Sequence, residues 1–153
     1  MKRTKKIALI MMTVALMAVC FVFGASAERT VIAAGECGVN ATYILYDDGE
    51  LVIDGTGTIE ENDYFWSNKS IVYLKINEGI TAINGWAFHE CSNLIQAELP
   101  NSITSIDSKA FIRCTSLESI TLSENLTELK GTFYGCSSLK KINIPEGDRK
   151  SVV

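Results

Sequence analysis

Residues 88–94 read FHECSNL, and the same pattern returns as FIRCTSL at residues 111–117 and as FYGCSSL at residues 133–139. The first step is 23 residues and the second is 22, because one residue is missing before Phe133. Five columns of apolar residues keep this spacing, the first of which includes the leucine that ends each motif: Ile71, Leu94, Leu117, Leu139; Leu74, Ala97, Ile120, Ile142; Ile76, Leu99, Leu122, Ile144; Ile80, Ile103, Leu126; and Ile83, Ile106, Leu129. So many columns in one register predict a stack of repeated structural units.

A unit of this length cannot bury its own apolar face, so stacked copies must shield one another and build a continuous core. Units of about 20–29 residues with an L-x-x-L-x-L core are typical of leucine-rich repeats, in which each unit adds one strand to a shared sheet. We therefore predict a mainly β fold over residues 70–147. It is a leucine-rich repeat solenoid with units of about 23 residues, one strand per repeat and short helical turns.

Within one unit, residues 94–99 have the alternation expected for a strand. The inward side chains are Leu94, Ala97 and Leu99, and the outward side chains are Gln96 and Glu98. Pro100 then ends the strand because it has no N–H group to donate to a ladder.

The rest of each unit brings the chain back to the next strand. Ile103 and Ile106 are expected to cross the other side as a second short strand. Residues 108–114 are expected to form a tight helical turn that buries Ala110 and Phe111.

The segment before the repeats does not follow their period. Two strand-like runs, residues 42–46 and 50–54, flank Asp47-Asp48-Gly49, which is a good three-residue hairpin loop. Gly55-Thr56-Gly57 is expected to be a further turn. We predict a β-hairpin cap over residues 28–69 that covers the apolar end of the stack.

Three aromatic residues, Tyr64, Phe65 and Trp66, lie just before the stack. We favour core packing between the cap and the first strand, and an exposed ligand contact is the alternative.

Longer segments show a family resemblance. The hairpin ATYILYDDGELVIDGTGTI, followed by INEGITAINGWAFHECSNL and FYGCSSLKKINIPEG, resembles the BspA-like leucine-rich repeat proteins over residues 36–147. The chain departs from the family in its few copies, in the deletion before Phe133 and in having no recognisable wall anchor. Family members are surface or secreted proteins of bacteria, and some are implicated in adhesion, so the resemblance implies a binding role without naming a ligand or a binding motif.

Residues 1–27 have the three parts of a signal peptide. MKRTKK is a positive n-region, an apolar run follows as far as Phe23, and Ala25-Ser26-Ala27 is a small-x-small cleavage site. Glu28 would then be the first residue of a secreted or cell-surface protein. The alternatives are a retained membrane anchor and lipidation of Cys20, which the preceding valine disfavours.

Residues 148–153 read DRKSVV and follow the last strand without a capping repeat. Repeat stacks normally need a polar cap at each end, and this tail is one reading frame of a common sequencing adapter. We expect an artefact of a truncated gene model here, and a disordered C-terminus is the alternative.

The charge balance excludes some classes of partner. The net charge is −4, and without the four basic residues of the n-region 10 basic and 18 acidic residues remain, which gives −8. Nucleic acid binding needs clustered Lys and Arg, and docking on anionic lipid needs basic residues as well. We therefore expect neither a nucleic acid partner nor membrane insertion after signal cleavage.

The cysteines of the mature chain are Cys37, Cys91, Cys114 and Cys136. The last three share one repeat position, so we favour a buried thiol ladder over two disulfides. Cys37 has no obvious partner. A ladder spaces thiols along an axis, whereas zinc needs ligands that converge on one point.

Two further constellations could carry chemistry. His89 and Cys91 could form a nucleophile–base pair, but His89 is the only histidine and its repeat position is variable. The acidic hairpin could bind Ca²⁺ through Asp47, Asp48, Glu50 and Asp54, but these residues lack the alternating spacing of calcium loops, which favours a solvated turn. We expect no enzymatic activity, no metal and no cofactor.

The candidate binding face consists of the outward residues of four consecutive strands: Tyr73, Lys75, Gln96, Glu98, Ser119, Thr121, Lys141 and Asn143. These positions vary from repeat to repeat while the inward positions stay apolar, as in a scaffold with adjustable contacts. Plain solvated strand residues are the alternative. We expect an extracellular binding or adhesion module for a protein ligand on host or neighbouring cells. A structural stalk, or a non-catalytic part of a longer wall-attached protein, is the alternative.

Overall fold

The computed structural model describes residues 28–60, 66 and 70–143. Its strands are β1 (Val31–Glu36), β2 (Asn40–Tyr46), β3 (Glu50–Ile59), β4 (Tyr73–Ile76), β5 (Ile80–Ile83), β6 (Gln96–Glu98), β7 (Ser105–Ile106), β8 (Ser119–Thr121) and β9 (Lys141–Asn143). No helix occurs in the described ranges, so these ranges contain no helix that could cross a membrane. The predicted signal peptide and the predicted tail lie outside these ranges.

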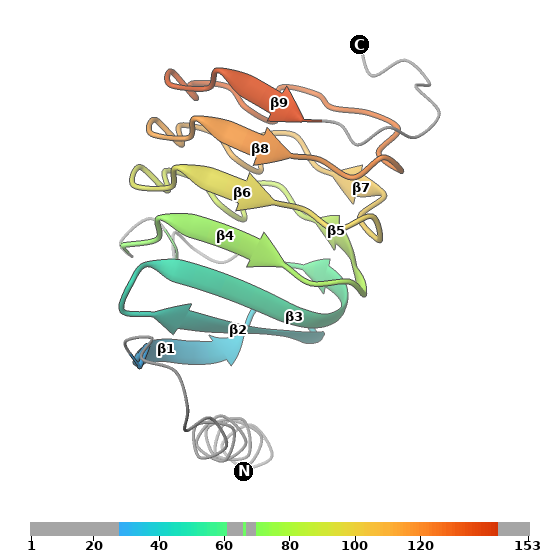
Figure 1. Ribbon diagram of the computed structural model, residues 1–153. Helices are drawn as coiled ribbons and strands as arrows, with labels where there is room; N and C mark the ends of the chain where they lie inside the picture. The colour runs from blue at the N-terminus through green and yellow to red at the C-terminus, as the bar shows by residue number, and fades with distance from the viewer. Residues whose placement is uncertain (1–27, 61–65, 67–69, 144–153) are drawn as a thin grey trace.

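The strands form the predicted solenoid (Figure 1). The main sheet has the order β1-β2-β3-β4-β6-β8-β9, and all pairs from β3 onward are parallel. Leu74 pairs with Ala97, Ala97 with Ile120, and Ile120 with Ile142, so one predicted column is a row of neighbouring rungs. A second set of short strands, β5 and β7, runs along the other side and pairs Ile83 with Ile106, as the sequence predicts.

The N-terminal cap is confirmed in part. β2 and β3 form the predicted antiparallel hairpin, with Gly49 at φ 85° in its loop. The expected turn at Gly55-Thr56-Gly57 is wrong, because these residues belong to β3. Gly55 has φ 116° and a Cβ atom there would lie 2.1 Å from the Asn40 carbonyl oxygen, so glycine is required. The bend lets β3 pair with β4 before it and with β5 after it.

A column of aromatic side chains runs through the core. Phe88 and Phe111 stack with ring centroids 5.0 Å apart, and Phe111 and Phe133 are 5.8 Å apart. Trp66 continues the column below Phe88 at 6.2 Å and meets Tyr43 of the cap edge-on at 4.7 Å. Trp66 is 1% exposed, which confirms core packing between the cap and the repeats. Tyr64 and Phe65 lie outside the described residues.

The repeated cysteines form the predicted thiol ladder. Cys91, Cys114 and Cys136 are free thiols, and the first two are buried. Cys114 Sγ donates to the Phe88 carbonyl oxygen at 3.1 Å, and Cys136 Sγ donates to the Phe111 carbonyl oxygen at 3.0 Å. The thiols of Cys114 and Cys136 thus each tie their repeat to the preceding one. Cys37 is also free and buried, in the cap.

Residues 108–114 bury Ala110 and Phe111 as expected, but they form a series of hydrogen-bonded turns rather than a helical turn. The Ile112 amide donates to the Lys109 carbonyl at 3.1 Å. Lys109 and Arg113 have φ 66° and 57°, and residues with positive φ cannot continue a right-handed helix. The equivalent positions in the next repeat are glycines, Gly131 and Gly135, at φ 59° and 78°.

Side chains also join neighbouring repeats at the loops after the main strands. Glu78 accepts the backbone amides of Asn101 and Ser102 at 3.1 and 3.0 Å. One repeat later, Asn101 Nδ2 donates to Glu124 Oε1 at 3.0 Å and Asn101 Oδ1 accepts the Glu124 amide at 3.3 Å. These residues are spaced by 23, so the polar loops follow the same register as the core.

The left-handed conformation at Lys109 predicts a reversal of the usual preference for alanine over glycine. A left-handed residue costs about 1–2 kcal/mol if it carries a Cβ atom, so glycine at this position avoids that cost. The greater conformational freedom of glycine in the unfolded chain offsets part of the advantage. Lys109→Gly should therefore be about 1 kcal/mol more stable than Lys109→Ala, as measured by urea denaturation. Both variants lose the contact of Lys109 with the Trp86 ring, so they are matched. Equal stability would contradict the backbone geometry.

The buried thiol of Cys37 predicts a pH dependence. Burial raises the pKa of Cys37 from 9.0 to about 12, so the folded protein holds the proton more tightly than the unfolded chain. The contribution of Cys37 to stability is complete below pH 9.0 and is lost as the pH rises from 9.0 towards 12. Urea denaturation at several values of pH should show a steeper alkaline loss for the wild type than for Cys37→Ala. Parallel curves would show that the thiol is not buried.

Candidate binding face

The eight residues predicted to face outward form two parallel rows on the main sheet. Tyr73, Gln96, Ser119 and Lys141 are paired in one row. Lys75, Glu98, Thr121 and Asn143 form the second row. Because neighbouring strands in a sheet lie about 4.8 Å apart, the two rows make one continuous surface, the outward face.

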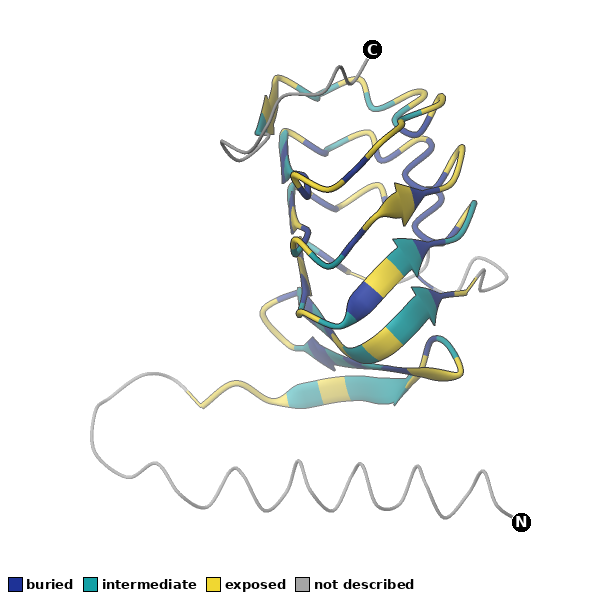
Figure 2. Cartoon of the chain, turned by 90° about the vertical axis from the view of Figure 1, so that its right-hand side faces the viewer, coloured by how far each residue is buried: buried dark blue, intermediate teal, exposed yellow. Residues whose placement is uncertain are grey.

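The outward face is accessible but partly ordered by its own contacts. Tyr73 is 47% exposed, and Lys75, Glu98 and Lys141 are exposed as well. Gln96 Nε2 donates to Glu98 Oε1 at 3.1 Å, which holds these two side chains together. Figure 2 shows that buried positions recur from turn to turn, so exposure follows the repeat.

The cap extends the outward face beyond the eight predicted residues. Glu50 pairs with Tyr73 and Val52 pairs with Lys75, which continues both rows onto β3. Ile44 of β2 pairs with Val52 and continues the second row further. The alternation along β3, in which Leu51 and Ile53 are buried, is the signal that could have identified these positions.

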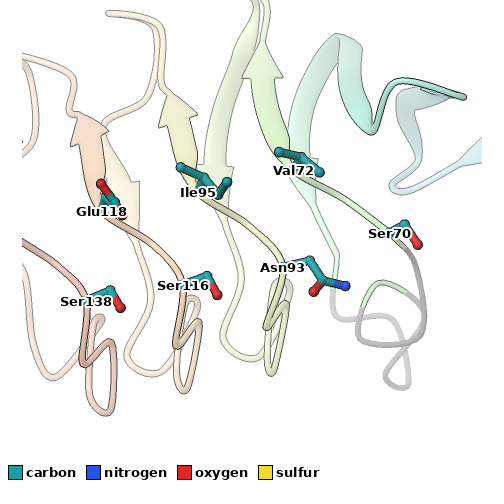
Figure 3. Close-up of a pocket in the computed structure, with 7 residues that line it drawn as sticks. All are labelled: Ser70, Val72, Asn93, Ile95, Ser116, Glu118 and Ser138. Carbon is teal, nitrogen blue, oxygen red and sulfur yellow. The ribbon is translucent and has the colours of Figure 1, made fainter.

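A groove runs beside the outward face, at the start of the main strands (Figure 3). Its volume is about 560 Å³, and it is lined by Ser70, Val72, Asn93, Ile95, Ser116, Glu118 and Ser138. The hydroxyl and amide groups recur at the residue before each leucine or isoleucine of the first column. The aliphatic part is formed by Val72 and Ile95, of which Ile95 is 39% exposed. A shallow polar row beside exposed aliphatic groups is suited to contact with an extended surface rather than to enclosing a small molecule.

The acidic hairpin uses its carboxylates for internal contacts. Asp47 accepts hydrogen bonds from the hydroxyl and amide of Thr30, which lower the pKa of Asp47. Arg29 forms ion pairs with Asp48 and Glu50 and lies 4.2 Å over the Tyr46 ring centroid. These contacts favour the solvated turn over a calcium loop.

His89 and Cys91, the residues considered as a nucleophile–base pair, both pack inside the repeats. The buried His89 ring meets the Trp86 ring edge-on at 5.0 Å, and its Nε2 atom lies 3.4 Å from Glu90 Oε1. Cys91 belongs to the thiol ladder. Within the described part of the chain, no group of three or more His, Cys, Asp or Glu side chains could hold a metal ion.

Solved structures of similar shape are leucine-rich repeat proteins of bacteria. One from Eubacterium ventriosum has a TM-score of 0.54 and 21% identity, with 72% of this chain and 39% of that protein covered. One from T. pallidum has a TM-score of 0.40 and 20% identity, with coverage of 66% and 78%. A leucine-rich cell surface protein from Faecalibacterium prausnitzii has a TM-score of 0.29 and 18% identity, with coverage of 88% and 45%. The first similarity supports the fold alone, and this chain spans 39% of that protein's length.

No curated protein matches the chain in sequence. A family model described as the BspA type leucine-rich repeat region matches residues 57–151 with six copies. This match covers more than half of the 153 residues and includes β4, β6, β8 and β9. The chain therefore belongs to the BspA-type leucine-rich repeat family.

Proposed function

We propose that this protein is an extracellular or cell-surface interaction module that binds a protein ligand through the outward face and mediates adhesion. The observation that carries the proposal is the contrast between the two sides of each strand. Inward residues Leu74, Ala97 and Ile120 stay apolar and buried, whereas the outward positions beside them change in charge and size. A rigid sheet with variable outward side chains is the usual binding surface of a solenoid.

The family supports this reading at a coarser level. Leucine-rich repeat proteins are interaction modules in general, and the family and fold are typically non-catalytic. The aromatic Tyr73 supplies a large contact area, and aromatic residues are enriched among those that dominate binding energy. The proposed ligand is a protein on host or neighbouring cells, because a flat, mixed polar and aliphatic surface suits a protein partner.

The predicted signal peptide supports an extracellular site of action, because the n-region, the apolar run and the Ala-Ser-Ala site of residues 1–27 follow the order of such a peptide. Expression in a bacterial host should yield a culture or envelope fraction whose N-terminal sequencing begins at Glu28. A chain that stays in the cytoplasm and begins at Met1 would contradict the extracellular role.

Binding is tested with matched variants. The purified protein is immobilised and presented with a panel of extracellular matrix proteins and with intact bacterial cells. Tyr73→Ser should weaken binding to the responding probe at least about tenfold, because an interface residue of this kind is worth more than about 1.4 kcal/mol. Tyr134→Ser is the control, since Tyr134 is 71% exposed at the turns and lies off the outward face.

A second matched pair tests charge. Glu98→Lys on the outward face and Asp107→Lys after β7 change the net charge equally, and both residues are exposed. Only the first should change affinity. Failure of every probe to bind, or equal effects of the face and control variants, would contradict binding through this face.

A further inference from the structure

One arginine side chain of the protein already lies against the cap. Arg29, in the segment before β1, places its guanidinium 4.2 Å over the Tyr46 ring centroid and forms ion pairs with Asp48, at 3.3 Å, and with Glu50. The ring lies at the end of β2, and the two carboxylates lie in the hairpin loop and at the start of β3. Tyr46, Asp48 and Glu50 thus form a guanidinium seat, which Arg29 fills.

The guanidinium seat belongs to the outward face. Leu45 and Leu51, which pair between β2 and β3, are buried in the core. Because side chains alternate along a strand, the adjacent Tyr46 and Glu50 point outward. Glu50 also pairs with Tyr73 of β4, which is 47% exposed. The seat therefore lies at the cap end of the surface proposed for binding.

The chemistry of the seat favours a guanidinium over other cations. A guanidinium is planar, so it can donate to carboxylates in a fixed fork and stack on an aromatic ring. A lysine ammonium is a strongly hydrated point charge without these two properties. The surrounding charge adds attraction for any cationic partner, because residues 28–60 contain seven acidic residues and one basic residue, Arg29.

The Arg29 side chain can leave the seat without detaching β1. It is 45% exposed, and exposed ion pairs contribute little to stability because water and salt screen them. The next residue is held by bonds of its own: the Asp47 amide donates to the Thr30 carbonyl at 2.9 Å, and the Thr30 amide donates to Asp47 Oδ1 at 3.1 Å. Release of the Arg29 side chain therefore leaves the backbone of the cap in place.

We infer that the guanidinium seat binds an arginine side chain of the protein ligand, and that Arg29 competes with this arginine in the free protein. The apparent affinity for the ligand is then reduced to the fraction of molecules in which the seat is empty. Tyrosine and arginine are among the residue types that dominate binding energy at protein interfaces. The inference rests on the proposed function, since it assigns the partner's chemistry at one end of the outward face.

Fluorescence anisotropy with a labelled oligo-arginine peptide tests the seat directly. At physiological ionic strength, Arg29→Ala should bind the peptide at least about threefold more tightly than the wild type, because the competing side chain is gone. Arg113→Ala is the matched control, because Arg113 is also exposed and also pairs with a carboxylate, Glu90, at 3.0 Å. It removes the same charge at the turns and should leave the affinity nearly unchanged.

Further variants identify the groups that form the seat. In the Arg29→Ala background, Tyr46→Leu and Glu50→Gln should each return the affinity to the wild-type level or below, with native circular dichroism. An oligo-lysine peptide of equal length should gain less from Arg29→Ala than the oligo-arginine peptide does. Equal gains for the two peptides, equal effects of Arg29→Ala and Arg113→Ala, or no loss in either folded double variant would overturn the inference.

Binding to the extracellular matrix protein or bacterial cell that responds separates this inference from the proposed function. Arg29→Ala should tighten that binding at least about threefold, whereas Tyr73→Ser should weaken it. If Tyr73→Ser weakens binding and Arg29→Ala does not change it, the outward face binds its ligand without an arginine in the seat, and only this inference fails. If Tyr73→Ser has no effect while the peptide results hold, the proposed function fails and the seat is confirmed as a site for arginine.

Discussion

The structure depends on contacts between equivalent side chains of successive repeats. Phe88 and Phe111 stack at 5.0 Å, and Ala97 lies between Leu74 and Ile120 in the parallel ladder. No repeat buries its apolar side alone, so each rung is stable only because a neighbour covers it. The thiol hydrogen bonds and the Asn101 bridges repeat at the same spacing because they rest on this register.

The same register explains how the chain separates stability from recognition. Inward positions are constrained by the neighbours above and below, and the turns tolerate left-handed residues such as Lys109 to keep Phe111 in place. Outward positions carry no such constraint, so they differ between repeats without cost to the core. The cap extends the surface, since Glu50 and Val52 continue the rows that begin on β4.

The periodic part of the fold and the outward rows could be predicted, because a strand side chain at a fixed repeat position has one orientation. What was missed lies where the period is weak. β1 consists largely of small residues, VIAAGE, which give little alternation. Gly55 and Gly57 predict a turn from sequence alone, because a sequence does not distinguish a chain reversal from a bend between two sheets. Trp66 stands 22 residues before Phe88 and belongs to the same aromatic column. The sequence does not reveal this, because the column has phenylalanine at its other positions. The groove depends on how adjacent loops pack against one another, and the spacing of residues in the sequence does not predict that packing.

Methyl-to-methyl nuclear Overhauser effects report directly on whether equivalent side chains of successive repeats are neighbours. Cross-peaks are expected from Ala97 to both Leu74 and Ile120, because these residues are direct partners in the parallel ladder although they are 23 residues apart. Cross-peaks from Ala97 that are confined to residues near it in sequence, or that are shifted from this register, would contradict the stack.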